Sequence, residues 1–235
     1  MKIKLYNDEI GCVELIEHMG TDLTIVNSAR VSFGKQKESL DDGDKKLISY
    51  LTKHKHTSTF EHNVATFRFK VPLFVARQHM RHRTWSYNEI SRRYTDFNIE
   101  FYEPTSLRTQ HKSNRQASNE DRFDPFLYSE FNTNVSLAIK NHHRKSLELY
   151  NTMLSAGICR EQARGVLPQN MYTEYYGTCN LSNLLKFIDL RTHGGAQQEI
   201  QVVAKALLSI SKELWPHAVT SYIKHRGISC GGETI

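Results

Sequence analysis

The sequence contains few of the features that divide a chain or place it in a membrane. No linker rich in proline, glycine or serine interrupts the 235 residues, which predicts a single domain around one sizeable core. No apolar run comes near the roughly 18 residues of a membrane-spanning helix, and the first residues lack the apolar segment of a secretory signal. We therefore expect a cytoplasmic protein with no membrane partner.

Cysteines are also scarce and scattered. The four of them, Cys12, Cys159, Cys179 and Cys230, lie far apart and form no C-x-x-C pair. This spacing argues against a zinc site built from thiolates and against a disulfide framework. We expect reduced thiols.

Sequence patterns of several enzyme classes are absent as well. There is no P-loop, no Rossmann glycine pattern and no G-x-S-x-G elbow. Paired carboxylates are not obvious either, so hydrolase chemistry has little support.

The stretch from 54 to 62 holds three histidines, His54, His56 and His62. They could suggest a metal cluster, but no cysteine, aspartate or further histidine stands nearby at helical spacing, so we expect no metal. Ser58 and Glu61 have the spacing of a capping box, in which two side chains satisfy free N–H groups at a helix start. That interpretation leaves the histidines unexplained.

Positive charge is the feature that the sequence has in excess. The net charge is +6, and residues 77–94 concentrate five arginines around a single carboxylate, Glu89. Neighbouring guanidinium groups repel one another, so this stretch predicts an anionic partner. Arg160 and Arg164, four residues apart, form a second basic face, for which a solvated helix surface is an equally good explanation.

The residues between the arginines indicate the kind of anion. Arginine binds phosphate and carboxylate in a two-pronged way, while the glutamine, asparagine and serine side chains of the same stretch can orient a polar heterocycle. A protein that grips nucleic-acid backbone would instead place lysine and arginine along an exposed face, with aromatic rings for stacking. The pattern favours a phosphorylated small molecule such as a nucleotide.

Apolar periodicity predicts an alternation of strands and helices. Strands are expected over residues 2–6, 63–71 and 97–102, and residues 172–178 read as a strand or a tight loop. Helices are expected over 22–30, from an N-cap at Asp44 to Lys53, from Pro72 to about Arg83, over 126–156 before Gly157, over 182–191, 196–215 and 218–225 before Gly227. Residues 86–93 read as an ordered loop and 105–121 as a flexible polar excursion.

One motif is specific enough to indicate a family. Arg81-His82-Arg83 followed after seven residues by Ser91 is the pattern R-H-R-x7-S, and the chain in this respect resembles the flavin-dependent thymidylate synthases. Further segments similar to that family lie at 29–33, 54–62, 72–78, 101–104, 163–168 and 190–199. Residues 105–125 and the C-terminal tail carry no clear similarity.

The resemblance implies a fold and a reaction. The fold would be α+β, a single domain with a mostly antiparallel central sheet flanked by long helices, as in thymidylate synthase-complementing proteins. The reaction would be reductive methylation of dUMP to dTMP, with 5,10-methylenetetrahydrofolate as carbon donor and FADH2, regenerated by NADPH, as hydride donor. The enzyme would be a homotetramer with active sites shared between subunits, and no cysteine would be needed as nucleophile.

The resemblance also implies roles for individual residues. Arg191 would lie at the uracil ring and act as the catalytic residue by favouring ionisation of the base, while Ser91 would bind through its hydroxyl. His56 would lie near the face shared by flavin and folate. The dUMP-binding residues would be Gln78, Arg81, Glu89, Ser91, Arg93, Arg164 and Arg191. The FAD-binding residues would be Ser58, Arg81, His82, Arg83, Glu89 and Asn180.

The chain departs from the family pattern at three places. His193-Gly194-Gly195 stands where relatives have Asp-Ser-His, Ser182 where an arginine is frequent, and Thr84 where an isoleucine is usual. Two other hypotheses remain open. A basic nucleic-acid-binding protein on the same scaffold would bind polyanions and no flavin, and a flavoprotein reductase would bind FAD without needing Arg164 and Arg191 together.

Overall fold

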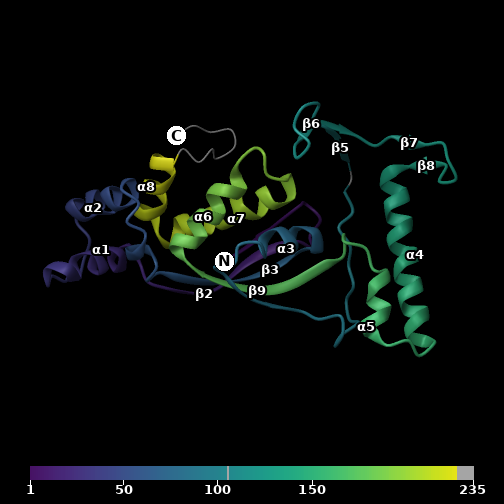
Figure 1. The fold of residues 1–235 in the computed structure, drawn as a ribbon, viewed down its shortest axis with the longest axis horizontal. Helices are drawn as coiled ribbons and strands as arrows, with labels where there is room; N and C mark the ends of the chain where they lie inside the picture. Colours follow the sequence, from purple (N-terminus) through teal and green to yellow (C-terminus); the bar gives the residue numbers. More distant parts are fainter. Residues whose placement is uncertain (105, 227–235) are drawn as a thin grey trace. The chain divides into compact units, whose positions relative to one another are not determined.

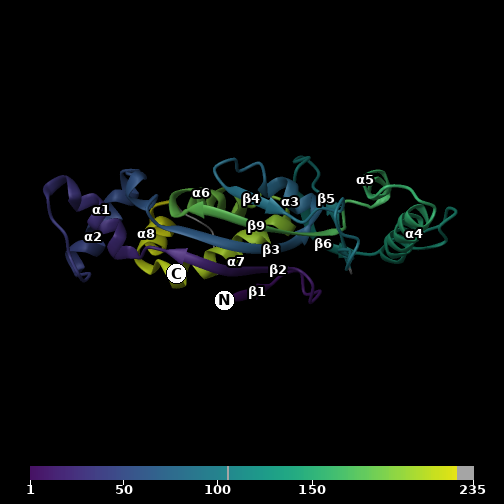
Figure 2. The ribbon, with the colours of Figure 1, turned by 90° about the horizontal axis from the view of Figure 1, so that it is seen from below.

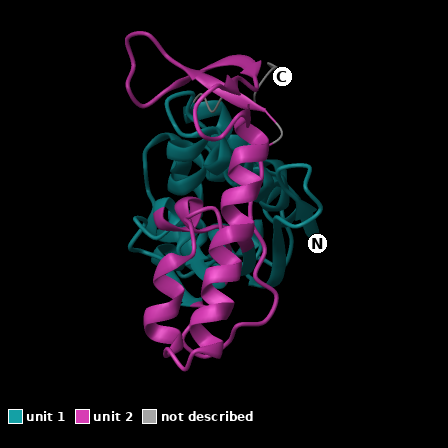
Figure 3. Cartoon of the chain, turned by 90° about the vertical axis from the view of Figure 1, so that its right-hand side faces the viewer, with its two compact units in different colours: residues 1–69, 78–88, 175–235 teal, residues 70–77, 89–174 magenta. Residues whose placement is uncertain are grey.

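The computed structural model describes residues 1–104 and 106–226, and these residues fall into two compact units (Figure 3). Unit 1 contains residues 1–69, 78–88 and those from 175 onward, and unit 2 contains residues 70–77 and 89–174. The single domain expected from the sequence remains a prediction, and each unit is described by itself. Cys230 and the helix end expected at Gly227 lie outside the described residues.

A five-stranded sheet is the centre of the fold. Its strands follow the order β1-β2-β3-β9-β4, with β1 and β2 antiparallel. Their bounds are β1 Lys2–Lys4, β2 Cys12–Met19, β3 Val64–Pro72, β4 Ser86–Glu89 and β9 Tyr172–Asn180. The α+β class predicted from the sequence is confirmed. Strand β2 was not predicted, because only its first two residues are buried and its exposed end shows no alternation.

Strand β3 confirms the alternation in the sequence. Ala65, Phe67, Phe69 and Val71 are fully buried, and the residues between them are half-buried. Helices α6 (Leu181–Thr192) and α7 (Gln198–Leu214) lie against one face of the sheet (Figures 1 and 2). Their apolar stripes bury large side chains, so strand and helices together form the core of unit 1.

Three further helices of unit 1, α1 (Asp22–Arg30), α2 (Asp42–Lys53) and α8 (Pro216–Arg226), pack together. The expected N-cap of α2 was wrong. Asp41 caps the helix, and the carboxylate of Asp44 is buried between Arg30 and Lys37 in ion pairs of 2.6 Å each. These cations hold the pKa of Asp44 far below its ordinary value despite burial. The carboxylate therefore links three segments of the chain.

Unit 2 is built around the long helix α4 (Val135–Ser155), which packs against α5 (Arg160–Ala163) and the 3-10 turn η3 (Arg164–Val166). Gly157 ends α4 with φ of 84°, as predicted. The helix begins at residue 135 rather than 126, because residues before it form a short hairpin of β7 (Phe126–Leu127) and β8 (Thr133–Asn134). None of the described helices is long and apolar enough to cross a membrane.

Two other expectations in unit 2 were wrong. The polar residues expected to be a flexible excursion include a hairpin of β5 (Leu107–Gln110) and β6 (Ser118–Phe123), held in part by hydrogen bonds between polar side chains such as Asn119 and Thr109. Residues 97–102 form no strand, and only Phe101 bridges to Met171. A polar hairpin shows no apolar period, which is why the sequence did not reveal it.

Candidate active site

Helix α6 brings three of the predicted site residues together in unit 1. Its first turn is capped by Asn180, whose side-chain oxygen accepts a hydrogen bond from the backbone N–H of Asn183 at 3.0 Å. Its last turn carries the half-buried Arg191. The Nε–H of Arg191 donates to Nε2 of His82 at 3.1 Å, and Nη2 donates to the carbonyl of Gln78 at 3.2 Å. Gln78, His82 and Arg191 therefore share one site.

The segment that carries Gln78 and His82 differs from the prediction. Helix α3 (Leu73–His79) ends at His79 instead of continuing to Arg83, and a turn follows in which the N–H of His82 donates to the carbonyl of His79 at 2.9 Å. His79 and Trp85 are both buried, and a continuing helix would turn residues six positions apart to different faces. The turn after His79, and not a continuous helix, therefore sets the position of His82 relative to Gln78.

Positive charge at this site has no carboxylate partner. Burial lowers the pKa of Arg191, and the neighbouring Arg81 lowers it further. Among the residues that the structure describes, neither arginine forms an ion pair. Gln78 is held from its other end, where its side-chain amide donates to the amide oxygen of Gln197. The site presents two arginines to an incoming group, which suits an anion or a ring that becomes negative.

His82 is neutral at this site. Burial, aided by the charge of Arg191, lowers the pKa of His82 to about 4. Because arginine can only donate, Nε2 of His82 is the acceptor and the ring proton sits on Nδ1. The imidazole thus orients the guanidinium without neutralising its charge.

A cage of aromatic side chains packs around His79, the residue at which the turn begins. His79 is fully buried, its Nδ1 lies 2.8 Å from the hydroxyl of Tyr175, and its ring packs against Trp85 and Phe187 with centroids 4.4 and 4.6 Å away. Burial places the pKa of His79 well below its ordinary value. Tyr87 completes the cage, and its hydroxyl donates to the carbonyls of His79 and His82 at 2.9 and 3.2 Å.

Acidic pH is expected to destabilise the protein through these two histidines. The pKa of His82 falls from 6.5 in the unfolded chain to about 4 in the folded one, so between these values only the unfolded chain takes up the proton. The free energy of unfolding should therefore fall as pH drops from 6.5 towards 4, by at most about 1.4 kcal/mol per pH unit for each histidine. Urea unfolding at pH 7.5 and pH 5 measures the difference.

The variant His82→Gln measures how much of this pH-dependent loss of stability comes from His82. Glutamine keeps an acceptor for Arg191 but does not titrate. The loss of stability between pH 7.5 and pH 5 should be smaller in this variant, with the remainder including His79. An unchanged loss would show that His82 is already free to take up a proton in the folded protein.

The other predicted substrate residues belong to unit 2. Glu89 ends strand β4, which replaces the first half of the loop expected at 86–93, and its carboxylate accepts a hydrogen bond from the hydroxyl of Thr173. The hydroxyl of Ser91 accepts from the backbone N–H of Arg93 at 3.3 Å. Arg93 and Arg164 are exposed. Unit 2 therefore presents two solvent-facing guanidinium groups, those of Arg93 and Arg164.

Two other arginines of unit 2 have structural partners. Arg92 is buried and donates to the carbonyls of Phe97 and Asn98 at 2.7 and 3.4 Å. Arg160 forms an ion pair of 2.8 Å with Asp96. Each of the two basic segments thus contains an arginine with a structural partner: Arg92, which is buried, and Arg160, which is exposed.

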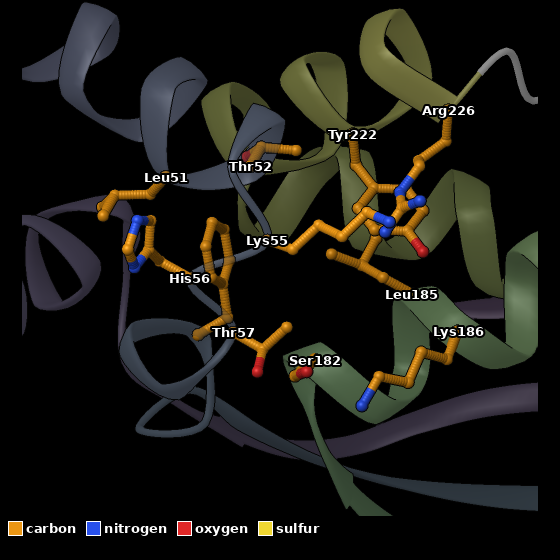
Figure 4. Close-up of a pocket in the computed structure, with 11 residues that line it drawn as sticks. Leu51, Thr52, Lys55, His56, Thr57, Ser182, Leu185, Lys186, Tyr222 and Arg226 are labelled. Carbon is orange, nitrogen blue, oxygen red and sulfur yellow. The ribbon is translucent and has the colours of Figure 1, made fainter.

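A pocket lies in unit 1, close in sequence to several predicted flavin residues (Figure 4). The end of α2, the segment after it, α6 and α8 each contribute to its wall. Its lining residues are Leu51, Thr52, Lys55, His56, Thr57, Phe60, Ser182, Leu185, Lys186, Tyr222 and Arg226. His56 belongs to this wall, while Ser58 and Asn180 each lie within two residues of a lining residue. Their roles in binding flavin stay predictions.

The local structure around Ser58 corrects one expectation. Ser58 begins the 3-10 turn η2 (Ser58–Phe60), and no side-chain cap of the expected capping box is present. The backbone N–H of Glu61 donates to the carbonyl of Ser58 at 3.1 Å instead.

His56 stacks on Tyr50 with centroids 6.1 Å apart. Within residues 1–104 and 106–226, no group of three or more potential ligands could hold a metal ion.

The pocket suits an anionic ligand with an apolar ring. Lys55, Lys186 and Arg226 contribute cations, and none of the described residues that line the pocket is acidic. Leu51, Phe60 and Leu185 supply an apolar surface. FAD has this combination of a diphosphate and flat rings, so the residues present fit that cofactor.

Sequence reasoning missed the cations of this pocket. Lys186 could have been found, because it stands four residues after Ser182 on a predicted helix and so shares its face. Lys55 and Arg226 come from distant parts of the sequence, and only the packing of α2 against α8 brings them together. No local sequence pattern predicts that these cations lie together.

Comparison with known proteins gives a consistent result. Residues 14–217 match the family described as thymidylate synthase complementing protein. A protein of Thermus thermophilus named flavin-dependent thymidylate synthase is 42% identical over 215 residues, which cover 92% of this chain and 76% of the relative. A protein of the same name from Kosmotoga olearia is 41% identical over 224 residues, covering 95% and 94%.

Solved structures resemble the whole chain. The UMP/dUMP methylase PolB from Streptomyces cacaoi, bound with 5-Br dUMP, matches with a TM-score of 0.79 and 33% identity, covering 97% of this chain and 100% of that one. A second structure of the same enzyme, bound with 5-Br UMP, matches with a TM-score of 0.80 and 32% identity. Similarity in sequence and in structure thus each extends over most of the chain.

Proposed function

This chain belongs to the thymidylate synthase complementing protein family, and we propose on that basis that it is a flavin-dependent thymidylate synthase. It methylates dUMP to dTMP, with 5,10-methylenetetrahydrofolate as carbon donor and NADPH as the source of reducing power. Bound FAD supplies the hydride chemistry, so the tasks of the protein are to bind, to orient and to exclude water. The observation that carries the proposal is the position of Arg191, held by neutral groups in a partly buried site.

Arg191 acts on the uracil ring. Its guanidinium is oriented by His82 and by the carbonyl of Gln78, neither of which carries a charge. The positive charge is therefore available to stabilise negative charge that develops on the base, and partial burial strengthens that attraction. Arg191 thereby favours ionisation of uracil and activates it for attack on the methylene group.

The remaining substrate contacts are assigned residue by residue. Gln78 and Arg81 bind the substrate, and Arg93 and Arg164 bind its phosphate through their guanidinium groups, which are exposed. Glu89 and Ser91 supply hydrogen bonds to the substrate. Ser91 does not act as a nucleophile, because none of the described hydrogen bonds links its hydroxyl to a base that could activate it.

FAD binds at the pocket of unit 1 and at the turn after α3. His56 lines the pocket and Ser58 and Asn180 each lie within two residues of a lining residue, while Arg81, His82 and Arg83 follow the end of α3. Three cations and an apolar wall support this placement. His56 lies at the face shared with folate.

The enzyme works as a homotetramer with active sites shared between subunits. Exposed apolar side chains on unit 2 support an interface with another copy: Phe126, Tyr128, Phe131, Leu137 and Leu149 are each at least 43% exposed. Light scattering after size-exclusion chromatography should give four times the chain mass of 27.3 kDa. A monomer in active preparations would contradict this part of the proposal.

The decisive experiment is an assay of the purified protein with dUMP, 5,10-methylenetetrahydrofolate, FAD and NADPH. The expected result is a yellow protein that forms dTMP. FAD uptake and NADPH oxidation without dTMP would indicate a reductase, and salt-sensitive polyanion binding without flavin would indicate the nucleic-acid-binding alternative. Because the structural relative is named a UMP/dUMP methylase, UMP should be assayed in parallel with dUMP.

Tyr87→Phe is expected to weaken FAD binding several-fold and to lower the free energy of unfolding by about 0.5–1.5 kcal/mol. The lost hydroxyl is the group that donates to the carbonyls of His79 and His82 and so shapes the turn bearing Arg81 to Arg83. Flavin fluorescence titration and urea unfolding measure the two effects. Tyr176→Phe, at an exposed position of β9, is the matched control, and equal FAD affinity in both variants would contradict this role of Tyr87.

A further inference from the structure

A tight loop of unit 2, residues 91–98, carries two of the residues assigned to the substrate, Ser91 and Arg93. The carbonyl of Ser91 accepts hydrogen bonds from the backbone N–H groups of Tyr94 and Thr95 at 3.0 and 3.2 Å, so the chain turns directly after Ser91. Asn98 ends the loop in a left-handed conformation with φ of 53°. The position of Arg93 therefore depends on the contacts that hold this loop.

Arg92 connects the start of the loop to its end. Its side chain is buried, and its guanidinium donates to the carbonyls of Phe97 and Asn98 at 2.7 and 3.4 Å. Among the residues that the structure describes, this guanidinium forms no ion pair, so the two carbonyls are its hydrogen-bond partners. Asp96 lies directly before these carbonyls, and Arg92 thereby restrains the backbone that carries it.

Asp96 joins the loop to helix α5. Its carboxylate accepts a hydrogen bond from Nη2 of Arg160 at 2.8 Å, and this contact lowers the pKa of Asp96. The backbone N–H of Arg164 donates to the carbonyl of Arg160, so both arginines belong to one turn. The ion pair therefore connects the loop that carries Arg93 to the turn that carries Arg164.

This connection opposes the repulsion between the two arginines assigned to the phosphate. Arg93 and Arg164 are exposed guanidinium groups, and like charges repel each other. Arg93 lies three residues before Asp96, and Arg164 lies four residues after Arg160, so the ion pair keeps their segments side by side. A site whose cations are already in place binds an anion more tightly than one that must first assemble.

We propose that Asp96 is a positioning residue, which through its ion pair with Arg160 holds Arg93 and Arg164 at the spacing that the phosphate of dUMP requires. This inference rests on the proposed function and adds a residue to it. Asp96 touches neither the substrate nor the reacting atoms. Its effect is on the affinity for dUMP and not on the turnover number.

The sign of the effect distinguishes positioning from simple electrostatics. Asp96 places a negative charge close to a site for an anion, and by charge alone its removal would tighten the binding of dUMP. Positioning predicts weaker binding instead, because the two segments are no longer connected. The two explanations therefore predict opposite results for one substitution.

Asp96→Ala in the full-length protein should weaken dUMP binding by about two- to fivefold, the range expected from an exposed ion pair. Deoxyuridine, which lacks the phosphate, should bind the variant and the wild type equally. The KM for dUMP should rise by the same factor, whereas the turnover number at saturating dUMP and the FAD affinity should not change. Calorimetric titration with dUMP, competition by deoxyuridine and steady-state kinetics give these readouts.

A double-mutant cycle tests whether Arg160 acts through Asp96. Arg160→Ala should weaken dUMP binding as much as Asp96→Ala does, and the double variant should lose no more than either, because all three remove one ion pair. The double variant also leaves the net charge unchanged, so its loss of affinity reports positioning without a change in the electrostatic field. Additive losses would mean that Arg160 binds the phosphate directly, which would overturn the proposal.

Glu148→Ala is the matched control. Glu148 forms an exposed ion pair of 2.7 Å with Arg144 on α4, and its loss should leave dUMP affinity unchanged. The proposal is also overturned if Asp96→Ala binds dUMP as tightly as the wild type or more tightly. Equal losses of dUMP and deoxyuridine affinity would overturn it as well, since they would indicate a general disturbance of the site.

Failure of the proposed function would look different. A wild-type protein that binds no dUMP and forms no dTMP contradicts the enzyme assignment itself. A wild-type protein that forms dTMP, while Asp96→Ala keeps its affinity for dUMP, contradicts only the role of Asp96. The wild-type measurement therefore decides which of the two inferences has failed.

Discussion

Arg191→Ala is expected to lower kcat/KM for dTMP formation by about 10²- to 10³-fold or more while leaving most of the FAD affinity in place. In the proposed function the guanidinium stabilises negative charge on the uracil ring, and it lies at the end of α6 rather than at the pocket wall. Arg191→Lys should lose less, because it keeps the charge but not the two-pronged geometry. Steady-state kinetics and flavin titration separate the two effects.

The same variant has a readout that does not depend on activity. Arg191 donates to Nε2 of His82 and its charge helps to hold the pKa of His82 near 4. Without Arg191, the pKa of His82 should rise toward its ordinary value, which NMR titration of the imidazole protons would show. Arg115→Ala, in the exposed connection between β5 and β6, is the matched control. Loss of flavin from Arg191→Ala would mean that the residue binds the cofactor instead.

The pattern of buried and exposed residues decided which helices and strands could be predicted from the sequence. Strand β3 and helices α1, α6 and α7 each bury one face, so period two or period 3.6 was visible. Strand β2 and the hairpin of β5 and β6 are mostly exposed or half-buried, and their residues show no such period. These elements are stabilised by backbone pairing and polar side chains, which sequence patterning does not report.

Tertiary contacts decided the points at which the local signals were ambiguous. Asp41 and Asp44 are both suitable N-cap residues for α2, and the ion pairs of Asp44 with Arg30 and Lys37 leave the cap to Asp41. The end of α3 is set in the same way, since His79 enters a cage formed by distant strands and helices. Motif spacing could identify Gln78, His82 and Arg191 as candidates, whereas the hydrogen bonds among them required the fold.

Phe187→Ala is expected to lower the free energy of unfolding by about 3–5 kcal/mol, one of the largest losses available to a single substitution in this chain. Phe187 is fully buried on α6, and its ring lies 4.6 Å from His79 and 4.8 Å from His82 between centroids. Alanine leaves a cavity that the cage closes only in part. Urea unfolding measures the loss, and Phe97→Ala, at a position 80% exposed, should stay within about 0.5 kcal/mol of the wild type.

The same substitution tests whether the aromatic cage supports Arg191, the proposed catalytic residue. At a temperature where Phe187→Ala is still folded, His82 lacks the ring that packs against its imidazole, so its hydrogen bond with Arg191 should loosen. The turnover number should then fall even though Phe187 touches no substrate, and Phe187→Leu, which leaves a smaller cavity, should fall less in both stability and turnover. Full turnover in a folded Phe187→Ala protein would show that α6 positions Arg191 without help from the cage.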